Sequence, residues 1–345
     1  MNPSEPIYLC GLASSFPDNK IESSFFNSAI VEPVQESKRR PNYNKMFLGP
    51  KYRRHVSRDQ SAVDLFEGAV QKLAEENSEF CIEQVDAILT NVSLPDVPFT
   101  GCGAYLARRL NIRPKAVLDL HNGGCISFLL LCEYAKALMH QKKLKNALIA
   151  IAQTSAGRIF AAEKIRIKPQ SSIPGDGACV AWISTEAKDQ VALIEPVLVQ
   201  CHPEFAEDMN MKFDDDRKYW EATNEPGYLE FPDDKVAAIL MRGNRLVPEV
   251  MHAVLKQASL NPSQIGGLVT NQPNEYFLRN WRESIEVSED RHFNTFQEYG
   301  NLFQAGIPVS LDKALRDGKI KIGQKIILAG FSHAGDYSAA GILNF

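Results

Sequence analysis

The sequence has no strong excess of charge of either sign. Its 38 lysine and arginine residues stand against 42 aspartate and glutamate residues, which gives a formal net charge of −4. A global positive field of the kind that attracts phosphate backbones is therefore missing, and we expect no nucleic acid partner. No run approaches the ~18 apolar residues of a membrane-spanning helix, and the first residues lack a signal-peptide pattern. We expect a cytoplasmic protein with no membrane partner.

Motifs for metals and redox cofactors are also missing. The chain contains no CxxC pair, no Cys/His metal spacing, and no GxGxxG, Walker or HExxH pattern. Its seven cysteines are an odd number scattered through apolar segments, which is typical of free thiols in a reducing compartment. We therefore expect no metal site and no tightly bound cofactor.

What the chain has is a regular alternation of β-rich runs and amphipathic helices over 345 residues. The length predicts two domains or one doubled domain, and the alternation predicts a layered α/β fold. The second half repeats the order of the first, and AILTN (87–91) is echoed by GLVTN (267–271). We predict a five-layered αβαβα body built from two duplicated βα halves, residues 1–187 and 188–345.

The predicted elements fall into two series. Strands are expected at 7–16, 85–94, 115–121, 146–155, 178–184, 191–200, 266–274, 324–333 and 337–345, and helices at 62–76, 101–111, 125–139, 247–258, 276–285 and 311–318. Residues 203–235 are acidic and show neither period, so they are either a solvated loop or a lid over a substrate channel.

Cys125 is the most informative residue. It follows the β-type run 115–121 and a flexible turn, Asn122-Gly123-Gly124, and it precedes a long apolar helix. A strand, a tight glycine turn and a nucleophile at a helix start form an elbow that lifts a side chain into a cleft. We expect the helix N-terminus to stabilise a thiolate there, although a buried structural cysteine fits the local sequence equally well. Cys102 and Cys132 lie in apolar helical stripes and are expected in the core.

Nearly the whole chain resembles β-ketoacyl-acyl-carrier-protein synthase III, a condensing enzyme of the thiolase superfamily. The matching segments stand in family order: LGPKYRRH (48–55), SLPDVPFTGCGAYLARRLNI (93–112), DLHNGGCISF (119–128), IPGDGACVAWI (173–183), LNPSQIGGLVTNQPN (260–274), YGNLFQAGIPVSLDKALRDGKIKIGQKIILAGF (299–331) and YSAAGILNF (337–345). The resemblance implies a thiolase fold, a homodimer, and an acyl-CoA or acyl-carrier phosphopantetheine thioester as substrate.

The resemblance also assigns catalytic positions. Cys125 matches the acyl-accepting cysteine and Asn301 the catalytic asparagine, whereas Asn271 stands where the family has its catalytic histidine. In the family, the histidine and asparagine donate hydrogen bonds to a thioester carbonyl and stabilise an enolate. An amide donates such a bond but cannot carry a proton, so acid or base catalysis at position 271 should be lost.

A substitute for that histidine is present in the sequence. His333 falls where the family's glycine-rich oxyanion loop normally has a glycine, between Ser332 and Ala334. We expect His333 near Cys125, either as a replacement base with Asp336 as its orienting partner or as a residue that only shapes the pocket.

Other predicted binding residues follow from matching positions. Phe99 matches a phenylalanine that reaches into the partner's acyl pocket, and Asn274 ends the NQPN motif. Tyr43, Arg53 and Arg54 fall near the family's cofactor entrance, where they are either ligand contacts or a solvated basic turn.

Three functions remain open on the sequence. The first is an acyltransferase that loads Cys125 and ends in Claisen-type C–C condensation in a specialised biosynthetic pathway. The second is an O- or N-acyltransferase that uses His333 as base. The third is a catalytically silent subunit that forms a heterodimer with an active paralogue. An acyl carrier protein is a further candidate partner.

Overall fold

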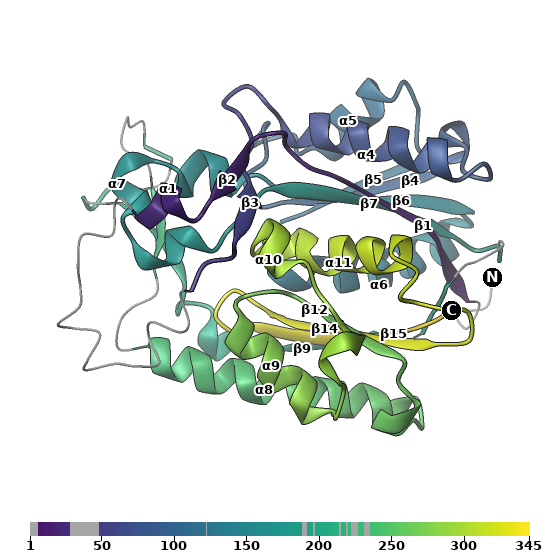
Figure 1. Cartoon of the computed structure of the whole chain (residues 1–345). Coiled ribbons are helices and arrows are strands. Elements are labelled where there is room, and N and C mark those ends of the chain that lie inside the picture. The colour runs from purple at the N-terminus through teal and green to yellow at the C-terminus, as the bar shows by residue number, and fades with distance from the viewer. Residues whose placement is uncertain are drawn as a thin grey trace.

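The molecule is organised around one mixed β-sheet (Figure 1). The computed structural model describes residues 6–27, 48–121, 123–187, 192–195, 197–213, 215–218, 220–221, 227–230 and 235–345. Within these residues the sheet has eleven strands in the order β13-β12-β14-β15-β8-β1-β7-β6-β4-β5, with β9 also paired to β15.

The first half of the sheet comes from the N-terminal part of the chain. Its strands are β1 (Ile7–Ser15), β4 (Ala87–Val92), β5 (Ala116–Leu120), β6 (Asn146–Gln153) and β7 (Gly177–Ser184). β4 pairs in parallel with β5 and β6, whereas β7 runs antiparallel to β6 and β1. Every residue of β4 and β7 is buried. Layers on both faces of the sheet explain why these strands read as continuous apolar runs.

The second half of the sheet repeats this pattern. Its strands are β8 (Ala192–Ile194), β9 (Leu198–Cys201), β12 (Gly267–Thr270), β13 (His292–Phe293), β14 (Lys325–Ser332) and β15 (Tyr337–Asn344). β12 is parallel to β13 and β14, and β15 is antiparallel to β14 and to β8 and β9. The two halves join where β1 pairs with β8. This repeated order supports a division into residues 1–187 and 188–345, which stays a proposal.

Helices form three layers around the two half-sheets, as Figure 1 shows from top to bottom. α4 (Ala62–Glu76) and α5 (Gly103–Arg109) cover the N-terminal half-sheet, and α8 (Val236–Gln257) and α9 (Glu275–Ser284) cover the C-terminal one. α6 (Ser127–Lys142) and α11 (Gly306–Arg316) lie between them. The predicted five-layered αβαβα architecture is confirmed.

The two central helices lie in the largest apolar cluster of the core, which includes Phe128, Leu131 and Ile307. Contact with a sheet on each side explains their apolar character around most of the circumference. α8 begins well before the predicted residue 247 and contains Pro248 in its interior. The predicted helix start was too late, because proline is normally found in the first turn of a helix rather than in its interior.

The smaller elements surround the end of the sheet where β5 and β14 finish. They are α1 (Ser24–Asn27), α7 (Glu163–Arg166), α10 (Phe296–Tyr299), the pair β2 (Lys20–Glu22) and β3 (Tyr52–Arg54), and the hairpin β10 (Asn210–Lys212) and β11 (Tyr228–Glu230). No helix of the described part of the chain is long and apolar enough to cross a membrane.

Candidate active site

The predicted elbow at Cys125 is present, with one difference in its geometry. β5 ends at Leu120, and a short 3₁₀ turn over Gly124–Ile126 carries Cys125 into α6, which begins only at Ser127. Gly124 has φ +50°, a backbone conformation that favours glycine. A methyl group on Gly124 would lie 2.0 Å from Ser332 Oγ. The glycine therefore allows the loop after β14 to pack directly against the turn that carries Cys125.

Cys125 opens into a cavity of about 320 Å³. The polar side chains that line it include those of Cys125, Asn271, Asn301 and His333, which the sequence singled out. Most of the remaining wall is apolar and comes from both halves of the chain: Leu94, Ile159, Phe160, Ile173, Met209, Met211, Leu229, Ile239, Phe277, Phe303 and Phe331. A mostly apolar cavity with a few convergent polar groups is the usual form of a small-molecule site.

The thiol of Cys125 is not the stabilised thiolate that the sequence predicted. Burial raises its pKa to about 12, the negative charge of Asp336 adds to the rise, and a hydrogen bond from the Asn271 side chain opposes it. The predicted stabilisation of a thiolate by the helix N-terminus is weak, because α6 starts two residues after Cys125. At neutral pH the sulfur is therefore protonated, and it needs a base before it can attack.

Asn271 is buried and largely committed to the backbone of β14. Its Nδ2 donates to the Phe331 carbonyl at 3.2 Å, and its Oδ1 accepts from the Phe331 amide at 3.4 Å. The same side chain also hydrogen-bonds Cys125. The amide of Asn271 is therefore held against the backbone of Phe331 and lies beside the thiol, so it is less free than Asn301 to polarise a substrate carbonyl.

Asn301 differs from Asn271 in the use of its amide. Its Oδ1 accepts from the Phe303 amide at 2.9 Å, which fixes the orientation of the side chain. No described residue accepts a hydrogen bond from its Nδ2, and the residue lines the cavity. The fixed oxygen leaves the NH₂ group available as a donor to a bound carbonyl.

His333 and Asp336 form an ordered pair beside this turn. His333 Nδ1 lies 3.0 and 2.9 Å from the two carboxylate oxygens of Asp336 and 2.9 Å from Ser332 Oγ. A carboxylate only accepts, so Nδ1 carries the proton and Nε2 of the neutral ring is the acceptor. Nε2 lies on the side of Gly124, where a methyl group would approach it to 3.0 Å. The ring is thus oriented with its basic nitrogen next to the turn that carries Cys125.

The other predicted residues of this loop and of the NQPN motif have structural contacts. Ser332 is buried beside Gly124, and the carbonyl of the buried Ala334 accepts from Arg242 at 2.6 Å. Asn274 lines the cavity and also caps α9, because its Oδ1 accepts from the Phe277 amide at 2.9 Å.

The two described residues that were predicted near the cofactor entrance, Arg53 and Arg54, both bond to backbone carbonyls of the protein. Arg53 is fully buried, packs over the Phe26 ring and donates to the Pro50 carbonyl, so its guanidinium does not face an incoming ligand. Arg54 donates to the Asp18 carbonyl at 2.8 Å. Tyr43 lies outside the described residues. Neither arginine lines the cavity, and this placement does not favour the predicted ligand contacts.

The segment 203–235 contains ordered structure that its sequence did not suggest. β10 and β11 pair as a hairpin, and Met209, Met211 and Leu229 from this region line the cavity. The prediction that residues 203–235 have no strand was wrong. Met209-Asn210-Met211 alternates apolar and polar residues, which is the signal that could have found the strand. The contacts favour the lid interpretation over a solvated loop.

His121 also lines the cavity, although the sequence reasoning passed over it. It stands four positions before Cys125 in the nucleophile segment and is exposed. Its place in the segment that carries the nucleophile was the available signal. The cavity therefore has two histidines, of which only His333 is oriented by a carboxylate.

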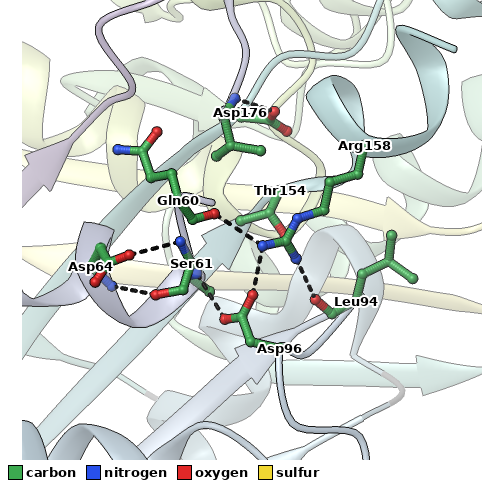
Figure 2. Close-up of polar contacts among 10 residues, drawn as sticks. Gln60, Ser61, Asp64, Leu94, Asp96, Thr154, Arg158 and Asp176 are labelled. Carbon is green, nitrogen blue, oxygen red and sulfur yellow. Dashed lines mark hydrogen bonds and ion pairs between the residues drawn. The ribbon is translucent and has the colours of Figure 1, made fainter. Parts of the chain in front are cut away.

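One wall of the cavity is held by an ion pair between Arg158 and Asp96 (Figure 2). Arg158 lies in a π-helical turn, Ala156–Phe160, and its guanidinium donates to Asp96 at 2.6 Å and to the carbonyls of Gln60 and Leu94. The second Asp96 oxygen accepts from the Ala62 amide at the start of α4. The pair thus ties α4, the π-helical turn and the loop that carries Phe99 together.

We expect Asp96→Asn to lower the free energy of unfolding by about 1–3 kcal/mol, because the partly buried guanidinium loses its counter-charge. Urea unfolding monitored by circular dichroism measures the change. Glu249→Gln is the matched control: it breaks the exposed Arg245–Glu249 pair on α8 and should change stability by under ~0.5 kcal/mol. Equal effects of the two variants would contradict the bridging role of Asp96.

Comparison with known proteins shows which proteins this chain is similar to. Residues 255–345 match the family model described as 3-Oxoacyl-[acyl-carrier-protein (ACP)] synthase III C terminal. The curated β-ketoacyl-[acyl-carrier-protein] synthase III of Neisseria gonorrhoeae is 23% identical over 332 residues, which cover 93% of this chain and 94% of the relative. The synthase III of Aliarcobacter butzleri is 25% identical over 300 residues, 82% of this chain and 83% of the relative.

Solved structures show the same fold across the full length. The synthase III of Pseudomonas aeruginosa superposes with a TM-score of 0.80 at 17% identity, covering 99% of this chain and 98% of the other. A variant of OleA from Xanthomonas campestris, solved with lauric acid and lauroyl-CoA, gives a TM-score of 0.82 at 15% identity and 99% coverage of both chains. The C-terminal match, the full-length relatives and the shared fold make this chain similar to the synthase III condensing enzymes, which are acyltransferases, as its sequence motifs predicted.

Proposed function

We propose that the enzyme takes an acyl group from an acyl-CoA or acyl-carrier thioester onto Cys125 and then transfers it to a second substrate. The observation that carries the proposal is the convergence of Cys125, His333 and Asn301 on one apolar cavity. A covalent intermediate divides the transfer into two easier steps. The OleA variant with bound lauroyl-CoA shows that a protein of this fold accommodates a long acyl thioester.

The first step follows from the raised pKa of the half-buried Cys125 thiol and from the oriented histidine. Nε2 of His333 accepts the proton of Cys125 Sγ, and the thiolate attacks the thioester carbonyl carbon. The new S–C bond forms, the bond to the donor sulfur breaks, and the departing thiolate takes the proton back from His333. Asp336 stabilises the imidazolium while it exists. This base is needed because burial raises the pKa of Cys125 to about 12.

For the second step we propose Claisen-type condensation, in which the Asn301 amide donates to the carbonyl of the acceptor and stabilises its enolate. Transfer to an oxygen or nitrogen acceptor is the second candidate, and a specific observation favours it. The Asn271 amide is held against the backbone of Phe331, so Asn301 is the better placed carbonyl donor, and the His333–Asp336 pair is suited to remove a proton from a hydroxyl or amine.

We also propose that the active form is a homodimer. Phe99 is fully exposed, and Val117 on the edge strand β5 is 41% exposed. Two copies joined along β5 would cover this edge, and Phe99 would then lie against the partner. A heterodimer with a paralogue would use the same edge. The proposed function covers both possible donors of the acyl group, an acyl-CoA and an acylated carrier protein.

Intact-protein mass spectrometry tests the loading step. We expect incubation with a panel of acyl-CoAs to add one acyl mass that maps to Cys125 and is missing in Cys125→Ala. Adding malonyl-CoA should then release carbon dioxide and a β-ketoacyl product, whereas discharge by alcohols or amines alone would support the second candidate. A wild-type protein that acquires no adduct from any acyl thioester, CoA-bound or carrier-bound, would favour the silent-subunit alternative.

A further inference from the structure

A buried arginine outside the cavity connects two of its walls. Arg242 lies on α8, is 9% exposed and stacks over the Phe205 ring, 3.4 Å from the ring centroid. Its Nη1 donates to the Ala334 carbonyl at 2.6 Å, and its Nη2 donates to Asp208 Oδ2 at 2.7 Å. One planar guanidinium thus bonds the loop that follows His333 and the segment that leads into β10.

Asp208 directly precedes the segment that carries the β10–β11 hairpin, which we call the lid. Asp208 is 4% exposed and also pairs with Lys235, the residue before α8. The next residue, Met209, and then Met211 line the cavity where an apolar chain would lie. Because Asp208 is held by two cations, the start of the hairpin has a fixed position over the cavity.

The Ala334 side belongs to the loop that orients the base. His333 has φ +47°, a left-handed backbone conformation that costs free energy in a non-glycine residue and needs support from neighbouring contacts, whereas Gly335, with φ +112°, adopts its conformation as a glycine can. Gly335 packs on Arg242, since a methyl group there would lie 2.4 Å from Arg242 Cδ. The carbonyl of Asp336 accepts from the His202 amide at 2.6 Å, which ties the loop to the residue that follows β9.

We propose that Arg242 is a positioning residue that sets both the orientation of the His333–Asp336 pair and the seat of the β10–β11 lid. Proton transfer from Cys125 and selection of the acyl chain then depend on one side chain that touches neither substrate nor sulfur. A lysine cannot replace it, because an ammonium group does not reproduce the planar fork that reaches Ala334 and Asp208 at once. The inference rests on the proposed function of Cys125 and His333.

The test measures Cys125 acylation by acetyl-CoA and lauroyl-CoA across pH in the full chain, using intact-protein mass spectrometry. Arg242→Met and Arg242→Lys should slow acylation by both thioesters by about 10²-fold and make the rate climb with pH, as expected for a thiol without its base. Asp208→Asn removes the ion pair of the lid and keeps the Ala334 contact. It should change the lauroyl-to-acetyl rate ratio by about tenfold and leave the pH profile unchanged.

Arg245→Met is the matched control, because Arg245 lies on the same helix, is exposed and pairs only with Glu249 among the described residues. It should leave both readouts unchanged. Folded Arg242 variants that keep the wild-type pH profile of acylation would overturn the inference. If the Arg242 variants fail to fold, an Asp208→Asn protein with an unchanged lauroyl-to-acetyl rate ratio would overturn it. A wild-type protein that forms no Cys125 adduct would instead overturn the proposed function, and the inference with it.

Discussion

His333→Ala is expected to slow acylation of Cys125 by about 10²–10⁴-fold, the usual contribution of a positioned general base. The reason is that burial raises the pKa of the thiol to about 12, so almost no thiolate exists near neutral pH without a proton acceptor. Single-turnover acylation with an acyl-CoA, followed by mass spectrometry, measures the loss.

The pH dependence of the same variant gives an independent readout. Below its raised pKa the thiolate fraction of Cys125 grows with pH, so the residual rate of His333→Ala should rise about tenfold per pH unit. The wild-type rate should depend on pH less steeply, because His333 accepts the proton of the thiol. His121→Ala is the matched control, because His121 also lines the cavity but has no carboxylate partner among the described residues. Identical profiles for wild type and His333→Ala would refute the base role.

Gly124→Ala should abolish most activity while the protein stays folded. The residue has φ +50°, which costs an L-residue roughly 1–2 kcal/mol, and the new methyl group would lie 2.0 Å from Ser332 Oγ. The turn or the loop must move, and a displacement of about 1 Å between reacting groups lowers rates by about 10²-fold. Acylation kinetics and thermal unfolding measure the two effects separately.

Gly318→Ala is the control that separates the effect of backbone strain from the effect of the steric clash with Ser332. Gly318 has a similar φ of +64°, but a methyl group there meets no atom within 4 Å. It should therefore lose a similar amount of stability to strain and keep the wild-type acylation rate. A Gly124→Ala protein with wild-type activity would show that Ser332 and His333 do not pack against the cysteine turn as described.

The layered fold and the location of the nucleophile could be predicted because their signals are local. Apolar strands alternate with amphipathic helices because each element buries one face or both against its neighbours. The predicted order is found in the structure as β4, α5, β5 and α6. The glycines before Cys125 mark a turn that only small residues allow. The replacement of histidine by asparagine at position 271, and the histidine at position 333, could be read by matching motifs.

The sequence could not give the electrostatic state of the site. It predicted a stabilised thiolate at Cys125, whereas the surrounding protein raises the pKa of this thiol. Desolvation depends on every segment that packs around a group, and those segments lie far apart in the chain. For the same reason the fully buried position of Arg53 was missed, because a basic pair in a turn looks the same whether it faces solvent or the core.

By itself the sequence determined the five-layered architecture and the candidate nucleophile, because periodicity and glycine turns are properties of neighbouring residues. Only the tertiary structure decided the partners of two other polar groups: Asn271 bonds Phe331, and Arg242 joins the lid to the loop of the base. These contacts join residues up to 92 positions apart. Hydrogen bonds at such separations follow from how whole layers pack, and no local pattern encodes them.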